Sequence, residues 1–211
     1  MKLISVNRGE ARPVTERGNV VMSGIYKEPV EAAVEITPLG LVGDTVANQK
    51  HHGGPDQAVY IYGGLDYDFW FAELGRRVPP GTFGENLTIS ELESAGFAAG
   101  DRLTIGQVVL EVTSPRIPCD TFAARMGDPE FKDAFRRAGR PGLYCRVIRP
   151  GPVQAGAAVT CQPYAGERVT MLELFRTYYE PQLSQAVIQR QLAAPVAIRV
   201  RKDREEKLKK L

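Results

Sequence analysis

Histidine and cysteine are scarce in this chain of 211 residues. There are two histidines, which are adjacent, and three cysteines, Cys119, Cys145 and Cys161. An odd number of cysteines with no close pair argues against a disulfide framework. No run of about 18 apolar residues occurs, which excludes a membrane-spanning helix, and residues 1–7 lack the features of a signal peptide. We therefore expect a cytoplasmic protein.

Most of the chain also lacks a net positive charge. The formal net charge is +2, but residues 199–211 alone hold seven basic and three acidic side chains. The remainder is therefore slightly acidic and offers no basic surface for a nucleic-acid polymer. We expect the basic residues near the C-terminus to form a solvated helix face. The sequence has no GxGxxG turn and no cysteine cluster, so it carries neither a nucleotide motif nor an iron–sulfur motif.

Strand signals dominate the first three quarters of the chain. Eight segments are short and rich in Val, Ile, Thr or Tyr, with turn-forming residues at most of their borders. We predict strands over residues 2–7, 30–37, 57–62, 86–90, 101–105, 108–114, 142–149 and 157–162. Gly106-Gln107 fits a tight hairpin turn. This pattern predicts a mainly β fold, a closed or nearly closed β-barrel, over residues 1–165.

A few helices are expected within and after this barrel. Leu65–Leu74 has apolar residues at helical spacing, and Asp128-Pro129 opens a helix that Gly139 ends. After residue 163 the pattern changes, because Thr170 and Glu173 form a capping box and the chain reads as three short helices. Short helices need a surface to pack on. We predict a small three-helix domain over residues 166–211.

The clearest chemical signal lies in Ser114-Pro115-Arg116-Ile117-Pro118-Cys119-Asp120. Two prolines stiffen the exit from a strand and fix the direction of Cys119. Asp120 or Thr121 is expected to cap a short helix, so Cys119 would lie near a helix N-terminus, and this position with Arg116 nearby favours the thiolate. A thiolate is a nucleophile or a soft metal ligand. The alternative is a buried apolar cysteine.

A second signal is the segment of residues 50–58, where both histidines precede the turn Gly53-Gly54-Pro55. Paired glycines let backbone N–H groups converge on an anion. His52 fits a phosphate or oxyanion, or donates a proton near neutral pH. The plainer alternative is a turn before a strand, in which Asp56 bonds to the backbone. Because all the histidine is in one glycine turn, a functional site is favoured.

Other polar turns and cysteines carry weaker signals. The turns of residues 39–44 and 83–87, the second of which contains Asn86, place acidic or amide groups beside glycine. Each alone is typical of an ordinary barrel corner. Cys145 and Cys161 lie in predicted strands, so we expect both to be structural.

Taken together, these segments resemble the MOSC domain, named after the C-terminal domain of molybdenum cofactor sulfurase. The resemblance rests on the order of six segments, Gly40–Asp44, His52–Ala58, Phe83–Leu87, Gly100-Asp101, Pro115–Cys119 and Gly142–Tyr144. It covers nearly the whole chain. The subgroup resembled is that of the stand-alone bacterial YiiM-like proteins, which carry a short three-helix domain after the barrel.

The resemblance implies a molybdenum cofactor (molybdopterin) bound through a pterin dithiolene and one protein cysteine, at the position of Cys119. Thiolate sulfur suits so soft a metal site. The candidate catalytic residues are then Cys119 and His52, with Cys119 as the metal ligand. The candidates for holding the cofactor are Arg116, His52, Gly53, Gly54, Asp56 and Asn86. The implied activity is the reduction of N-hydroxylated purine bases, hydroxylamines or amidoximes, which serves detoxification.

Such a reductase needs electrons from a separate flavin or iron–sulfur reductase. The expected partners are that electron donor, a small N-hydroxylated substrate and, in a homodimer, a second copy, with no membrane and no nucleic-acid polymer. Two other functions stay open. One is a carrier or sulfur-transfer module that handles the cofactor without turnover. The other is a cysteine hydrolase with Cys119, His52 and Asp56 as nucleophile, base and orienter.

Overall fold

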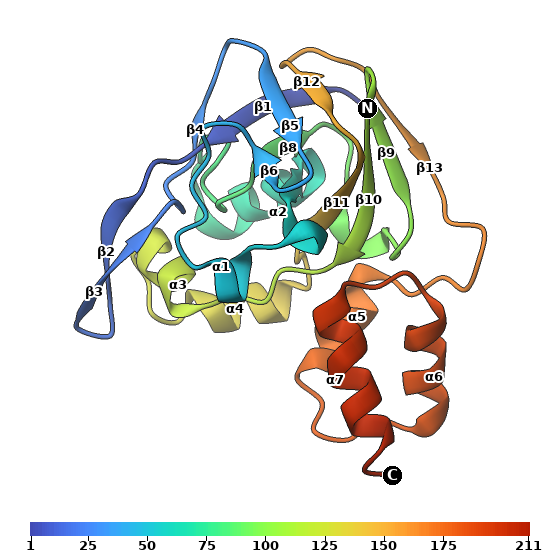
Figure 1. The fold of residues 1–211 in the computed structure, drawn as a ribbon. Helices are drawn as coiled ribbons and strands as arrows, with labels where there is room; N and C mark the ends of the chain where they lie inside the picture. The colour runs from blue at the N-terminus through green and yellow to red at the C-terminus, as the bar shows by residue number, and fades with distance from the viewer.

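The computed structural model describes residues 1–211, with the side chains of residues 1–49 and 52–211. A curved eight-stranded sheet forms the upper body of the molecule in Figure 1, with helices around and below it. In spatial order its strands are β13 (Val159–Gln162), β9 (Arg102–Ile105), β10 (Val108–Ser114), β11 (Leu143–Arg149), β7 (Val59–Gly63), β8 (Leu87–Ile89), β1 (Leu3–Arg8) and β4 (Glu28–Pro29). The pair β7–β8 is parallel, and the other pairs are antiparallel.

Smaller strands and the helices complete the fold. A three-stranded sheet holds β12 (Gly151–Val153), β5 (Val34–Thr37) and β6 (Gly40–Leu41), and a hairpin pairs β2 (Arg12–Glu16) with β3 (Asn19–Ser23). The helices are α1 (Gln49–His52), α2 (Gly64–Leu74), α3 (Asp120–Met126), α4 (Phe131–Ala138), α5 (Met171–Tyr178), α6 (Gln185–Ala193) and α7 (Ile198–Leu208), with 3₁₀ turns η1 (Pro55–Gln57) and η2 (Ser94–Gly96). None of the described helices is long and apolar enough to cross a bilayer.

The large sheet curls but is not a closed barrel. An isolated bridge joins Lys2 to Ala158, and the amide of Leu3 donates to the carbonyl of Ala157 (2.9 Å). This contact brings the start of β1 to the start of β13 without a continuous ladder. Helices also occupy about as many residues as strands. The predicted mainly β barrel is therefore only partly confirmed. The fold is mixed α/β with an open sheet, because closure depends on long-range register that local patterns do not encode.

The predicted elements are found with shifted bounds. Each of the eight predicted strands corresponds to a strand of the structure, and Gly106, at φ 57°, makes the tight turn between β9 and β10. Gly139 ends α4 at φ 62°, as predicted, but this helix begins after Glu130, whose amide bonds to the Asp128 side chain (2.8 Å). Helix α3 is capped by Cys119 instead of Asp120 or Thr121. The β2–β3 hairpin was not predicted.

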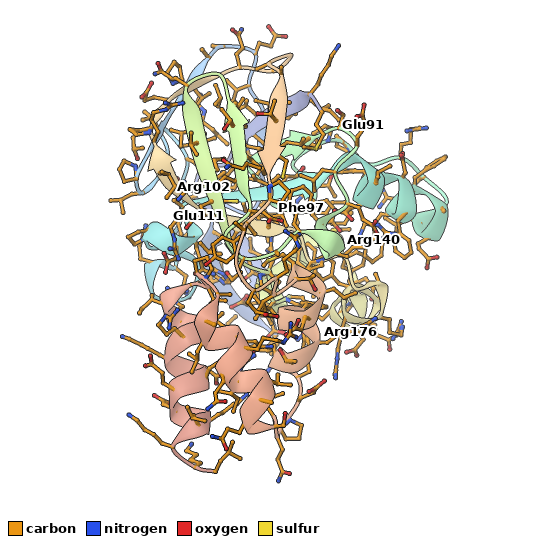
Figure 2. All side chains as sticks on the ribbon, turned by 90° about the vertical axis from the view of Figure 1, so that its right-hand side faces the viewer. Glu91, Phe97, Arg102, Glu111, Arg140 and Arg176 are labelled. Carbon is orange, nitrogen blue, oxygen red and sulfur yellow. The ribbon has the colours of Figure 1, made fainter. Side chains whose placement is uncertain are left out.

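Two clusters make up the hydrophobic core. An aliphatic cluster packs between the strands and continues to the C-terminal helices through Val169, Met171 and Leu174. An aromatic cluster, which includes Trp70, Phe83, Phe122, Phe135 and Phe175, packs the helices α2, α3, α4 and α5 against the strands. Phe97, labelled in Figure 2, joins the two parts of the chain, because its carbonyl accepts the Met171 amide (2.7 Å). The domain boundary near residue 165 stays a prediction.

Candidate functional site

Cys119 lies between the end of β10 and the start of α3. Pro115 and Pro118 flank this connection, and each fixes its own φ and offers no N–H group. Cys119 itself is the N-cap residue, with φ −122° and ψ 174°. Its carbonyl accepts the amides of Phe122 and Ala123, both at 3.1 Å. The thiol is free and half-buried, so the sequence holds one sulfur in a fixed direction with access to solvent.

Two adjoining cavities meet at this sulfur. The larger has a volume of about 510 Å³ and the smaller about 160 Å³. They share lining residues from β2, the α1–η1 region, α3 and β11, namely Glu16, Asn48, His52, Gln57, Cys119, Thr121 and Tyr144. The larger cavity is in the size range of pockets that hold small ligands. The candidate site therefore has a free thiol at the junction of a large and a small compartment.

Arg116 is a buried cation in the wall of the small cavity. It is 5% exposed, and its guanidinium lies over the rings of Tyr60 (5.1 Å) and Phe122 (4.4 Å). One nitrogen, Nη1, donates to the carbonyl of Phe83 (2.6 Å), whereas Nε has no hydrogen-bond partner among the described residues. Burial lowers the pKa of Arg116, but Tyr144, Tyr60 and Cys119 raise it by more. The site thus holds a permanent positive charge with an unused donor.

A second buried charge in the small cavity is neutralised. The ammonium of Lys27 pairs with the carboxylate of Asp44, and both side chains are less than a tenth exposed. Burial lowers the pKa of Lys27, although Asp44 acts in the opposite direction. The same carboxylate accepts the amide of Gly9 (2.8 Å) and the side-chain amide of Asn86 (2.8 Å). Asp44 is therefore held in place from three sides.

The turn that carries Phe83 and Asn86 is ordered by a buried acid. Glu85 is fully buried and accepts bonds from the hydroxyl of Tyr67 (2.6 Å) and the amide of Gly81 (2.6 Å). Burial raises the pKa of Glu85 despite these bonds. The side chain of Asn86 donates to Asp44 and accepts a hydrogen bond from the amide of Tyr60 (3.1 Å), so both of its polar atoms are bonded within the protein. Asn86 supports the small cavity by holding Asp44.

His52 ends α1 and lines both cavities. Its amide donates to the carbonyl of Asn48 (2.9 Å). Burial and the positive charges of Arg116 and Arg199 lower the pKa of His52 to about 4. At neutral pH the imidazole is therefore uncharged, so it offers hydrogen bonds to a ligand but not the proton of an imidazolium. The side chain of His51 lies outside the described residues.

Gly53, Gly54 and Asp56 follow His52 in the chain, and none is among the lining residues of either cavity. The amide of Gly53 donates to the carbonyl of Gln49 (3.2 Å), and Gly54, at φ 101°, turns the chain into η1. The carboxylate of Asp56 pairs with Arg146 (3.0 Å) and accepts the amide of Ile198 (2.6 Å). These three predicted residues therefore build the scaffold, while Cys119, His52, Arg116 and Asn86 surround the cavities.

The C-terminal helices supply one side of the large cavity. Leu174 and Tyr178 come from α5, and Arg199, Val200, Asp203 and Arg204 come from α7. Arg204 is 3% exposed and bonds to Gln191 (2.6 Å), so part of the predicted solvated basic face is buried. The connection that carries Cys119 forms another side, and the residues shared with the small cavity complete the wall.

Several lining residues were not predicted from the sequence. Asp44 and Tyr144 lie within segments that stood out, the turn of residues 39–44 and the Gly142–Tyr144 segment. Lys27, Glu16 and Arg199 had no signal, because a charged residue on a short polar segment or helix is normally solvated. The rings of Tyr144 and Tyr60 pack in a tilted arrangement, with centroids 4.9 Å apart.

Comparison with known proteins places this arrangement in a family. The model of the MOSC domain matches residues 48–160. YflK of Bacillus subtilis is 34% identical over 155 residues, which are 74% of this chain and 70% of YflK. YiiM of Escherichia coli is 33% identical over 138 residues, 64% of this chain and 62% of YiiM. A protein of Gibberella moniliformis named Reductase is 32% identical over 157 residues, but these are only 27% of its length.

Solved structures share the fold over almost the whole chain. YiiM from Geobacillus stearothermophilus has a TM-score of 0.80, covers 98% of both chains and is 24% identical. YiiM from Escherichia coli has a TM-score of 0.73, covers 94% of this chain and 91% of its own, and is 24% identical. The family model spans more than half of the chain and includes His52, Arg116 and Cys119. This chain belongs to the MOSC domain family.

Proposed function

We propose that this protein reduces N-hydroxylated compounds with a molybdenum cofactor held through Cys119. One observation carries the proposal: Cys119, whose thiol is free, lines both cavities, and the small cavity is also lined by Arg116, whose buried Nε has no partner among the described residues. Membership of the MOSC family and the fungal relative named Reductase support an oxidoreductase. The natural compound class, whether N-hydroxylated purines, hydroxylamines or amidoximes, is part of the proposal.

The residues present fit such a cofactor. No group of three or more His, Cys, Asp or Glu among the described residues could hold a metal ion, so a metal at Cys119 needs further ligands from a non-protein group, as a pterin dithiolene provides. A thiolate is the soft ligand that such a metal takes. The buried Nε of Arg116 and the buried hydroxyl of Ser114 both lack protein partners in the described chain. Arg116 is suited to bind an anionic or carbonyl oxygen of the pterin.

The cavity side chains would bind and orient the substrate. The cofactor, when bound, supplies the two electrons that break the N–O bond, while two protons enter and water leaves. Neutral His52 would hydrogen-bond the N-hydroxyl group without adding charge. Burial raises the pKa of Tyr144, so its phenol keeps its proton at neutral pH and would donate to an oxygen atom. Leu174 and Tyr178 would pack against the rest of the substrate and exclude water.

The electrons must come from a second protein in this proposal. The sequence has no GxGxxG turn and no cysteine cluster, so a flavin or iron–sulfur reductase is the expected donor. All three described cysteines are free thiols, which fits a reducing compartment such as the cytoplasm.

The test is turnover of an N-hydroxylated substrate by cofactor-loaded protein. Reduced viologen dye replaces the unknown electron donor, and formation of the amine or amidine is followed by chromatography. Wild type is expected to turn over, whereas Cys119→Ala is expected to lose activity. Cys161→Ala is the matched control, because Cys161 lies in β13 and does not line either cavity.

The same experiment distinguishes the other functions. A carrier or sulfur-transfer module would bind the cofactor in wild type and yet produce no amine with the dye. A cysteine hydrolase would cleave an ester without metal. The hydrolase has little support, since the carboxylate of Asp56 is engaged by Arg146 and the amide of Ile198.

A further inference from the structure

The N-terminus of α7 is joined to residues 49–57, which we call the His52 turn. The carboxylate of Asp56, in this turn, accepts the amide of Ile198, the first residue of α7 (2.6 Å). Ala197 precedes the helix and donates its amide to the carbonyl of Thr113 in β10 (3.0 Å). Because Ala197 has no side-chain acceptor of its own, Asp56 supplies the cap that α7 lacks.

Arg199 makes the reverse connection from α7 to the same turn. Its Nη2 donates to the carbonyls of Gly53 (3.0 Å) and Gln49 (3.3 Å), and its Nη1 donates to the side chain of Gln57. The carbonyl of Gln49, the first residue of α1, also accepts the amide of Gly53 (3.2 Å), whereas the carbonyl of Gly53 lies just beyond the C-terminal end of α1. A positive charge is favourable at this end of a helix. One guanidinium thus fastens both ends of the turn that carries His52.

Charged side chains of the sheet also bond to both the His52 turn and the segment before α7. Arg146 of β11 pairs with Asp56 (3.0 Å) and donates to the carbonyls of Pro195 (3.2 Å) and Val196 (3.3 Å), just before α7. Glu111 pairs with Arg146 (3.4 Å) and with Arg102 (2.9 Å). Figure 2 labels Glu111 and Arg102 side by side on the strands above the C-terminal helices. The turn and α7 are therefore held as one unit.

We propose that Arg199 is a positioning residue for the His52 turn, so that α7 completes the candidate site. The turn is short, with α1 of four residues followed by two glycines. Such a segment has little stability of its own. Arg199 and His52 both line the large cavity, so loss of the anchor would disturb the substrate side. The kinetic part of this inference rests on the proposed function.

The test compares three variants of the full chain. Arg199→Gln removes the charge and the guanidinium donors, and Arg199→Lys keeps the charge but has a single ammonium group. Lys202→Gln is the control, since it removes a charge from an exposed position on α7. Backbone hydrogen exchange is measured for the amides of His52, Gly53 and Gln57. We expect roughly tenfold faster exchange in Arg199→Gln, an intermediate rate in Arg199→Lys and the wild-type rate in Lys202→Gln.

Kinetics of the cofactor-loaded protein supply the second measurement. Arg199→Gln is expected to raise KM roughly tenfold while its molybdenum content stays at the wild-type level. Exchange or KM equal to that of Lys202→Gln would overturn the inference, and so would faster exchange spread over the whole chain. A third outcome is faster exchange confined to residues 49–57 in Arg199→Gln, while the wild type reduces no N-hydroxylated substrate. This outcome would support the anchoring role of Arg199 and refute the proposed function.

Discussion

At the scale of single residues, Arg116 is a buried cation with aromatic neighbours and no carboxylate within ion-pair distance in the described part of the chain. Lysine at this position keeps the charge but lacks Nε and the planar group that stacks on Phe122. We predict that Arg116→Lys lowers cofactor affinity roughly tenfold, measured as molybdenum per chain. The control is Arg136→Lys, since Arg136 is exposed and lies over Tyr179 at 4.1 Å. Equal molybdenum in the two variants would contradict the assigned role.

His52 gives the stability a pH dependence of known sign. Its pKa is lowered from 6.5 to about 4, so between these values the unfolded chain binds more protons than the folded one. Stability present above pH 6.5 is therefore lost as the pH falls towards 4, by at most about 3 kcal/mol. In His52→Asn the free energy of unfolding by urea should fall less between about pH 7 and about pH 5 than in wild type.

A second buried group acts in the opposite direction over part of this range. Burial raises the pKa of Asp66 from 3.8 to about 6, so the stability it contributes below pH 3.8 is lost as the pH rises through 6. The two effects partly cancel in wild type. Asp66 is present in both proteins, so the difference between His52→Asn and wild type isolates the histidine. Identical pH dependence in the two proteins would show that His52 is not held in its neutral form.

At the scale of elements, α5 begins with a side-chain N-cap, Thr170, which was predicted from the sequence. The hydroxyl of Thr170 accepts the amide of Glu173 (3.1 Å). Thr170→Ala leaves this amide without its acceptor and should lower the free energy of unfolding by about 1 kcal/mol. Thr170→Ser keeps the hydroxyl and should stay close to wild type in the same urea titration. A serine variant that loses as much as the alanine variant would exclude the cap as the cause.

Elements were predictable where a local pattern sets the structure. The apolar alternation of residues 108–114 and the turn Gly106-Gln107 are sufficient for β10 and its hairpin, because both depend on neighbouring residues. The β2–β3 hairpin was missed. Its turn, Arg17-Gly18, requires positive φ at a non-glycine residue, which no local pattern predicts. The open sheet was also missed, since its ends approach through one isolated bridge at Lys2 and Ala158.

The candidate site was predictable to the same extent. Cys119 and His52 stood out because their residue types are rare and their neighbours are prolines and glycines. Lys27 and Arg199 did not, since only the folded chain places Asp44 beside Lys27 and the His52 turn beside Arg199. Gly53 and Asp56 were predicted to hold the cofactor, and in the structure their polar groups bond to α7.

At the scale of the whole molecule, the sheet and the C-terminal helices share one aliphatic core. Residues of both parts belong to this single cluster. We therefore predict that both parts unfold in one cooperative transition. Fluorescence of Trp70, the single tryptophan, reports the aromatic cluster beside the sheet, and circular dichroism reports all helices. The two signals should have the same urea midpoint. A separate, earlier loss of helical signal would instead indicate that residues 166–211 unfold as an independent domain.

The whole account depends on the sulfur of Cys119 as the point where the cofactor is held. The direct measurement is molybdenum and oxidised pterin per chain, in protein purified from a host that makes the cofactor. Wild type and Cys161→Ala should contain both in equal amounts, and Cys119→Ser should lose the metal. Molybdenum at the wild-type level in Cys119→Ser, or none in wild type, would contradict the account.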